Sequence, residues 1–190
     1  MAARPPSGPP AAQWPGPPGR LFIGVVGPGQ PDAVRDARAE TVGRLLAEAG
    51  AVVVCGGLGG VMAAACRGAS SAGGTTVGLL PGDDRRSANP WVTVPLPTGL
   101  GELRNGLVVR AADALVAVGG GYGTLSEMAL ALKTGCPVVG LDAWPVPAPI
   151  GGPAVVSCPD PAIAVSRVLA LARNRRDPAG DGRHAPPEGV

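Results

Sequence analysis

Histidine and lysine are nearly absent from the sequence, which contains one of each. The histidine, His184, lies in a polar tail, so the sequence argues against mechanisms that need a histidine base. The four cysteines show no C-x-x-C spacing and are Cys55, Cys66, Cys136 and Cys158. This pattern favours buried, reduced thiols over a zinc site or disulfide bonds, and we expect no metal site.

Charge of one sign and long apolar runs are also lacking. The net charge of +2 predicts no strong electrostatic field for nucleic acid. No apolar run reaches the roughly 18 residues that span a bilayer, and the first residues lack the apolar core of a signal peptide. We therefore expect a cytoplasmic protein whose partners include neither nucleic acid nor a membrane.

Proline and glycine are abundant, and proline marks the ends of the chain. Residues 1–20 hold seven prolines and almost no large apolar side chains, and residues 174–190 have a similar composition. Both segments are predicted to be disordered tails. Residues 21–173 remain as a single domain, which is long enough to bury a substantial core.

Within this domain, short apolar runs alternate with helical patterns. Strands are predicted at 21–26, 51–55, 75–80, 91–96, 114–118 and 137–141, with a short one at 155–156. Helices are predicted at 32–49, from the second strand to about 72, and at 102–112, 125–134 and 161–173. Strands that are apolar on both faces and separated by helices indicate a Rossmann-like α/β fold, a parallel sheet with helices on both faces.

Glycine clusters follow three of the predicted strands, at Gly27–Gly29, Gly56–Gly60 and Gly119–Gly123. In such a fold these loops share one edge of the sheet, where ligands bind. None of them matches G-x-G-x-x-G, and the chain has no G-x-x-x-x-G-K-[ST], which disfavours classical NAD binding and P-loop chemistry. The clusters favour a monophosphate or similar anion held at helix N-termini.

The last cluster runs from strand into helix as V-G-G-G-Y-G-T-L-S-E. Amides near Gly123–Leu125 and the helix dipole are expected to attract an anion, with a further bond from the Thr124 hydroxyl. Alternatively, Thr124 and Glu127 form a capping box, and both roles can coexist. The cluster Gly56–Gly60 has its own alternative, a tight turn that needs small residues, but two such junctions on one edge favour a shared ligand.

Three segments carry a family resemblance: GGLGGVMAAACRGASSAGGTTVGLLPG, PTGLGELRN and ADALVAVGGGYGTLSEMALALKTGCPVVGL. Over residues 21–173 the chain resembles the Lonely Guy-type superfamily, once labelled lysine decarboxylase-like. It is most similar to the branch of molybdenum-cofactor carrier proteins. The resemblance implies a Rossmann-like fold, phosphate binding at the glycine–threonine–glutamate motif, and dimers or larger oligomers. The decarboxylase label gains no support, because no pyridoxal-lysine context surrounds Lys133.

In the phosphoribohydrolases of this superfamily, a P-G-G-x-G-T-x-x-E motif and an upstream Arg-Lys pair release a base from a nucleoside 5′-monophosphate. The resemblance implies that Gly120–Thr124 hold the phosphate, Glu127 is the catalytic carboxylate and Arg104 its cationic partner. Two positions depart from that pattern: Gly119 replaces the proline and Asn105 replaces the lysine. Both departures resemble the carrier branch.

The candidate ligand-binding residues are Gly27, Gly56, Gly57, Gly59, Gly60, Arg104, Asn105, Gly119, Gly120, Gly121, Gly123, Thr124 and Glu127. Three functions stay open: a binding protein for a phosphorylated, nucleotide-like ligand such as a molybdopterin-type cofactor, a nucleoside 5′-monophosphate phosphoribohydrolase, and a nucleotide-sensing scaffold. Arg104 and Glu127 would be catalytic only in the hydrolase. No other cofactor is required. We expect a homo-oligomer, dimer or tetramer, because Met128–Leu132 leaves few polar positions on its helix.

Overall fold

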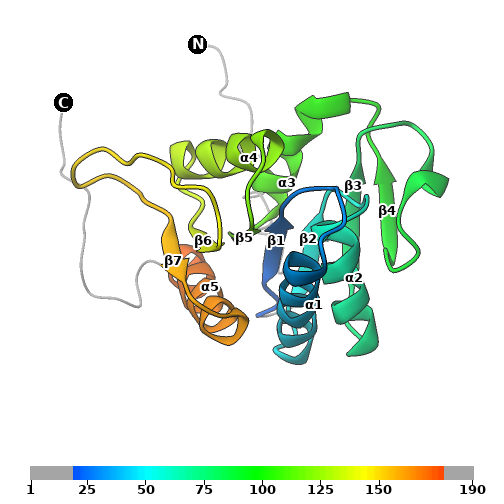
Figure 1. Ribbon diagram of the computed structural model, residues 1–190, viewed down its shortest axis with the longest axis horizontal. Coiled ribbons are helices and arrows are strands. Elements are labelled where there is room, and N and C mark those ends of the chain that lie inside the picture. Colours follow the sequence, from blue (N-terminus) through cyan, green and yellow to red (C-terminus); the bar gives the residue numbers. More distant parts are fainter. Residues whose placement is uncertain (1–18, 178–190) are drawn as a thin grey trace, which may run out of the picture.

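Seven parallel strands form one sheet within residues 19–177, the part of the chain that the computed structural model describes. They are β1 (Phe22–Val26), β2 (Val52–Cys55), β3 (Thr76–Leu80), β4 (Val94–Pro97), β5 (Ala114–Val118), β6 (Val138–Leu141) and β7 (Val156–Cys158). Their order is β4-β3-β2-β1-β5-β6-β7, with β1 and β5 adjacent at the centre (Figure 1). The topology switches between these two strands, and ligands of open α/β sheets bind beside such a point.

Helices cover both faces of the sheet. They are α1 (Ala33–Glu48), α2 (Val61–Ser71), α3 (Asn105–Ala111), α4 (Tyr122–Lys133) and α5 (Pro161–Arg176), with short 3₁₀ turns η1 (Arg85–Ser87) and η2 (Gly101–Arg104). Helices α1, α2 and α5 pack on one face, and α3 and α4 pack on the other (Figure 1). The predicted Rossmann-like α/β domain is therefore confirmed.

Side chains of the central strands serve both layers. Ile23 and Val25 of β1 pack beneath α1, α2 and α5, whereas Val26 packs beneath α3 and α4. In β5, Val116 packs beneath α1, α2 and α5, whereas Leu115 packs beneath α3 and α4. Because both faces are buried, the strand sequences are continuously apolar rather than alternating.

Two helices differ from the predicted bounds at the carboxyl edge of the sheet. The helix expected over 102–112 is the 3₁₀ turn η2 followed by α3, and Arg104 stands at the junction. Helix α4 begins at Tyr122 instead of residue 125, because Gly121 is its extended N-cap and accepts a hydrogen bond from the Leu125 amide at 2.8 Å. Both differences concern residues near the predicted ligand site.

Helix α5 also extends beyond the predicted domain boundary at residue 173. Asp113 joins the first and last elements of the domain: it accepts the Phe22 amide at 2.7 Å and the Arg176 Nε at 2.8 Å. Arg176 Nη1 also donates to the Arg20 carbonyl at 2.6 Å, and Arg175 bonds to two carbonyl oxygens after α3. The remainder of the predicted tails, 1–18 and 178–190, lies outside the described residues.

The sheet ends at β4 on one side. Thr98, directly after this strand, donates its amide to the Leu80 carbonyl at 3.1 Å, so amides at even positions of β4 face β3. Successive backbone amides of a strand point in opposite directions. The nitrogens of Pro95 and Pro97 therefore face the open edge of the sheet, the position where proline is tolerated in a strand.

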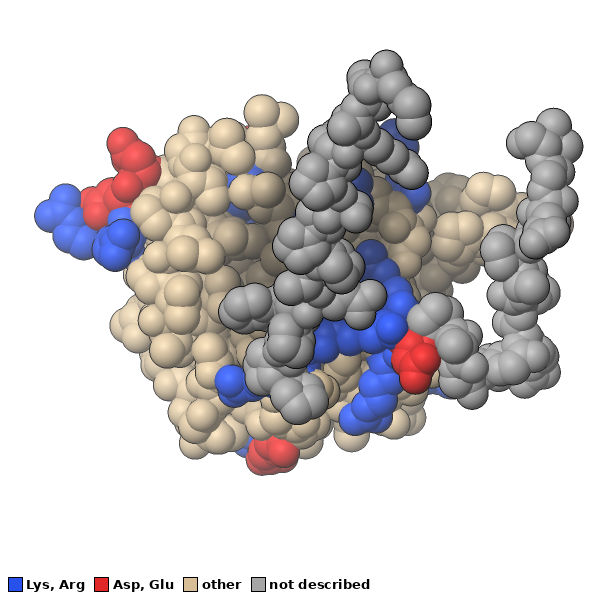
Figure 2. Space-filling view, turned by 180° about the vertical axis from the view of Figure 1, so that it is seen from behind, with Lys and Arg blue, Asp and Glu red and all other residues tan. Residues whose placement is uncertain are grey.

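Large apolar side chains are exposed at several places on the surface. Uncharged residues cover most of the face seen in Figure 2. On α4, Met128 and Ala131 are buried, Leu130 and Leu132 are half-buried, and Ala129 is exposed. The exposed apolar residues around η2 and α3 are Leu100, Leu103 and Leu107. Self-association stays a prediction. No helix among the described residues has the length and apolarity needed to cross a membrane.

The bonds of Asp113 make a testable contribution to stability. Asp113→Ala leaves the half-buried Phe22 amide and Arg176 without their acceptor, so the free energy of unfolding should fall by about 1–2 kcal/mol. Arg173→Ala, an exposed change in the same helix, should alter it by less than about 0.5 kcal/mol. Urea unfolding followed by circular dichroism measures both. Equal stability of the two variants would show that Asp113 does not hold the ends of the domain together.

Candidate functional site

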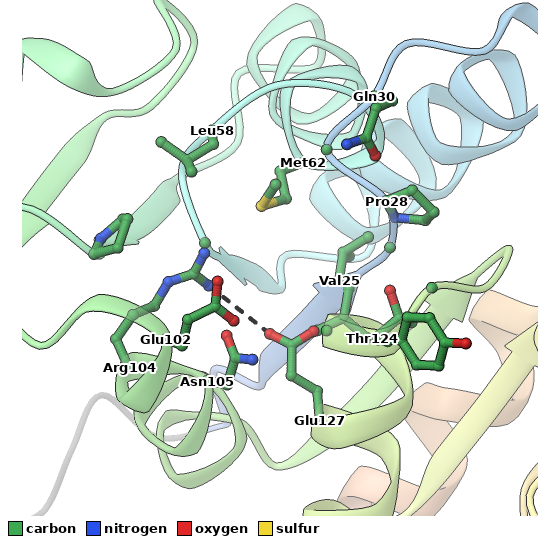
Figure 3. A pocket seen from close by; sticks show the side chains of 18 of the residues that line it. Val25, Pro28, Gln30, Leu58, Met62, Glu102, Arg104, Asn105, Thr124 and Glu127 are labelled. Atoms are coloured by element: carbon green, nitrogen blue, oxygen red, sulfur yellow. Dashed lines mark ion pairs between the residues drawn. The ribbon is translucent and has the colours of Figure 1, made fainter.

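A cavity of about 580 Å³ opens at the carboxyl ends of β1, β2 and β5 (Figure 3). Its walls come from the loop after β1, the loop after β2, the η2–α3 junction and the first two turns of α4. The lining residues are Val25, Val26, Gly27, Pro28, Gly29, Gln30, Gly56, Leu58, Met62, Pro81, Gly101, Glu102, Arg104, Asn105, Gly121, Tyr122, Gly123, Thr124 and Glu127. The cavity thus lies at the topological switch point between β1 and β5.

Arg104 reaches this cavity from the η2–α3 junction and is 8% exposed. Its guanidinium lies directly against the Gly56 backbone: a Cβ atom at residue 56 would lie 2.2 Å from Nη1. The Nε atom is buried, and no acceptor among the described residues bonds to it. A buried donor without a partner costs free energy, which an anionic oxygen of a ligand would recover.

Glu127 faces Arg104 from α4 and is 6% exposed. Its Oε1 lies 3.8 Å from Arg104 Nη1, and the two side chains point toward one another with Asn105 beside them (Figure 3). Burial raises the pKa of Glu127 to about 7, against the opposing effect of the Arg104 charge. Near neutral pH this carboxyl group can therefore either donate or accept a hydrogen bond.

The first turn of α4 carries no side-chain cap. Because the helix begins at Tyr122, Thr124 is already inside its first turn, and the capping box expected between Thr124 and Glu127 is not formed. Thr124 is instead buried and lines the cavity. The amides of Tyr122, Gly123 and Thr124 are the ones that a helix leaves without internal acceptors, and they suit an anion.

The cavity brings together most of the residues that the sequence predicted. Those that line it are Gly27, Gly56, Arg104, Asn105, Gly121, Gly123, Thr124 and Glu127. Those that do not are Gly57, Gly59, Gly60, Gly119 and Gly120. The second group owes its small size to contacts within the protein.

Gly59 and Gly60 bring the loop after β2 close to the loop after β1. A Cβ at Gly60 would lie 2.4 Å from the Pro28 carbonyl oxygen, and one at Gly59 would lie 3.0 Å from that of Gly29. The Val61 amide, the first of α2, donates to the same Pro28 oxygen at 3.1 Å. The N-terminus of α2 is therefore partly satisfied by protein and is not open to a ligand as α4 is.

The other three glycines make room for large side chains. Gly57 lies against Leu80, and a Cβ at Gly119 would meet Arg35 Cδ at 2.5 Å. Gly119 also has a φ of +68°, which side chains rarely adopt. Gly120 lies against the ring of Trp144, whose Cδ1 would be 2.0 Å from an added Cβ. These glycines thus position the loops around the cavity.

Three polar lining residues were not predicted: Gln30, Glu102 and Tyr122. Gln30 directly follows the first glycine cluster, and Tyr122 stands inside the third. Their place after a parallel strand was the available signal, since such positions converge on one sheet edge. Glu102 belongs to the PTGLGELRN segment, two residues before Arg104.

All four cysteines are free and buried, as predicted. The fold nevertheless brings two of them together behind the cavity wall, where the sulfur atoms of Cys55 and Cys66 lie 3.4 Å apart. The hydrogen bond with Cys66, followed by burial, raises the pKa of Cys55 well above its usual range. Cys55 is therefore a neutral thiol that packs beside Leu58 and Met62.

With this geometry in view, comparisons with known proteins identify the family. The family model described as the SLOG cluster4 family matches residues 20–155. The chain belongs to the SLOG cluster4 family. A relative from Archaeoglobus fulgidus is 43% identical over 143 residues, which cover 75% of this chain and 92% of that protein.

Solved structures place this SLOG cluster4 protein beside molybdenum-cofactor proteins. The molybdenum cofactor binding protein of Rippkaea orientalis is 33% identical with a TM-score of 0.73, over 80% of this chain and 97% of that one. The molybdenum cofactor carrier protein of Chlamydomonas reinhardtii is 36% identical with a TM-score of 0.73, over 81% and 99% of the two chains. The resemblance to the Lonely Guy-type superfamily and its carrier branch is confirmed.

The raised pKa of Glu127 predicts how stability depends on pH. Between pH 4.5, the ordinary pKa, and about 7, the folded state binds more protons than the unfolded state. The free energy of unfolding should therefore fall as pH rises through this window. Glu127→Gln mimics the protonated carboxyl, so it should match the wild type near pH 4 and exceed its stability at pH 8 by up to roughly 3 kcal/mol.

Urea unfolding at the two pH values tests this expectation. Glu102→Gln is the matched control, since Glu102 lines the same cavity but is exposed. This control should follow the wild type at both pH values. A Glu127→Gln variant with the same pH profile as the wild type would mean that the carboxyl group titrates normally.

Proposed function

We propose that this SLOG cluster4 protein binds a phosphorylated, nucleotide-like ligand and serves as a carrier of a molybdopterin-type cofactor. Arg104 carries this proposal, because it is a buried cation that lines a ligand-sized cavity and its Nε has no acceptor among the described residues. The volume of about 580 Å³ falls within the roughly 300–1,000 Å³ typical of small-molecule sites. The similarity to two molybdenum-cofactor proteins supports this choice of ligand.

The residues of the cavity fit the chemistry of such a cofactor. The first turn of α4 and Thr124 would hold its phosphate, with Arg104 as the balancing cation. Glu127 and Asn105 would accept hydrogen bonds from the N–H groups of a pterin or base. When bound, the cofactor supplies its molybdenum centre, and the protein contributes binding, orientation and exclusion of water.

Retention of the ligand through purification tests the carrier function. We expect the full chain, purified from a bacterium that makes the cofactor, to retain a pterin that becomes fluorescent after oxidative release. Gly123→Val should leave the fold intact, because no atom of the protein lies within 4 Å of an added Cβ. The new side chain would instead occupy space in the cavity that the ligand needs, so the retained pterin should fall about tenfold or more.

Ala129→Val is the control, since it places the same β-branched side chain on an exposed position of α4. It should retain as much pterin as the wild type. Equal retention by the Gly123→Val variant, or the absence of pterin from the wild type, would count against the proposal. The scaffold hypothesis depends on partners of the tails, which lie outside the described residues. We also propose that the carrier is a cytoplasmic protein and that it forms a homo-oligomer.

A second candidate function, the phosphoribohydrolase, draws support from the protonation of Glu127. A carboxyl group with a pKa of about 7 beside a cation suits proton transfer near neutral pH. Carboxylates also stabilise positive charge on the sugar ring during glycoside hydrolysis. Asn105, however, stands where the hydrolases carry lysine, so the cavity has one cation fewer for phosphate binding.

Base release from a panel of nucleoside 5′-monophosphates separates the two functions. The wild type should release free base slowly or not at all, because a lost charged contact lowers rates by orders of magnitude. Asn105→Lys should increase any residual release, and Glu127→Ala should eliminate it. Chromatography of the free base gives the rate. Fast release by the wild type that disappears in Glu127→Ala would establish the hydrolase instead.

A further inference from the structure

Tyr122 is the one aromatic side chain among the described residues that line the cavity. It is the first residue of α4, and it is 84% exposed. Helix α4 also carries Thr124 and Glu127, so the ring and the polar groups of the cavity share one rigid support. An aromatic ring left uncovered at a ligand cavity has a large apolar surface available for a partner.

The position of this ring is set by Trp144, which comes from the loop between β6 and β7. The two ring centroids lie 5.5 Å apart with an interplanar angle of 89°, an edge-to-face arrangement. Trp144 can approach so closely because Gly120 has no side chain: a Cβ there would lie 2.0 Å from Trp144 Cδ1. The Gly120 of the predicted phosphate motif therefore serves to hold an aromatic pair.

The edge-to-face contact leaves most of Tyr122 free. Only a small part of the side chain is covered, as its 84% exposure requires. The helix fixes the backbone of Tyr122, and the contact with Trp144 favours one orientation of its ring before a ligand binds. Stacking on a ring that is already oriented costs less entropy than stacking on a mobile one.

We propose that Tyr122 is the stacking surface for the planar heteroaromatic ring of the ligand, and that Trp144 is the residue that positions it. This inference rests on the proposed binding function, in which Arg104 and the first turn of α4 hold the charged end. The cavity would therefore select phosphorylated compounds with a purine- or pterin-like ring over sugar phosphates without one. Tyr122 sets the preference for a planar ring, whereas Arg104 binds the charged end that both kinds of compound share.

Calorimetric titration with two probes tests this division of roles. GMP carries a fused planar ring, and ribose 5-phosphate carries the same sugar phosphate without it. Tyr122→Ala should weaken GMP binding about tenfold and leave ribose 5-phosphate binding unchanged. Tyr122→Phe, which keeps the ring, should bind both probes as the wild type does. Arg104→Ala should weaken both probes together.

Trp144 requires a separate comparison because it acts through Tyr122. Trp144→Ala should weaken GMP binding severalfold without changing ribose 5-phosphate binding, and Trp144→Phe should restore GMP binding. A wild type that binds both probes and a Tyr122→Ala variant with unchanged GMP affinity would overturn this inference and leave the proposed function intact. A wild type that binds neither probe would overturn the proposed function and, with it, the stacking role.

Discussion

A guanidinium and a carboxyl group, both removed from water, face each other 3.8 Å apart at the carboxyl edge of the sheet. Taking two such groups out of water costs several kcal/mol for each ion, which a single loose contact does not fully recover. Arg104 can occupy this place only because residue 56 is a glycine, since a side chain there would clash with the guanidinium. A protein selected only for stability has no reason to keep this arrangement, whereas a protein that binds an anion has one.

The remainder of the fold holds these two groups in place. Arg104 stands at the junction of η2 and α3, and Glu127 lies on α4. Helices α3 and α4 cover one face of the sheet, and α1, α2 and α5 cover the other. The Val61 amide donates to the Pro28 carbonyl, and Gly60 lets the loops after β1 and β2 approach closely, so one wall of the cavity is a packed unit of backbone. The first turn of α4 presents its backbone amides to the cavity without a side-chain cap. The cavity is therefore lined by polar groups on the α4 side and by closely packed backbone on the side of the loops after β1 and β2.

The fold could be predicted from the sequence because the spacing of apolar residues and the glycine-rich turns determine each strand and helix locally. Apolar runs between glycine clusters predict the strands, and the family motifs indicate Arg104 and Glu127 as a pair. The start of α4 was wrong because Gly121, not Thr124, ends the extended segment. Gly119 and Gly120 show a more general limit: a pattern indicates that space is needed at a residue, but not whether a ligand or a protein side chain such as Arg35 or Trp144 fills it.

The two prolines of β4 bear on how the protein behaves in crowded solution. Parallel sheets end in strands whose unpaired amides can recruit a further strand, which is the usual route to fibrillar aggregation. Here Pro95 and Pro97 remove those amides from the outward side of β4, and the chain is otherwise rich in apolar strands. The two prolines thus hinder the addition of a further strand at the β4 edge of the sheet, where no helix is needed to cover that strand.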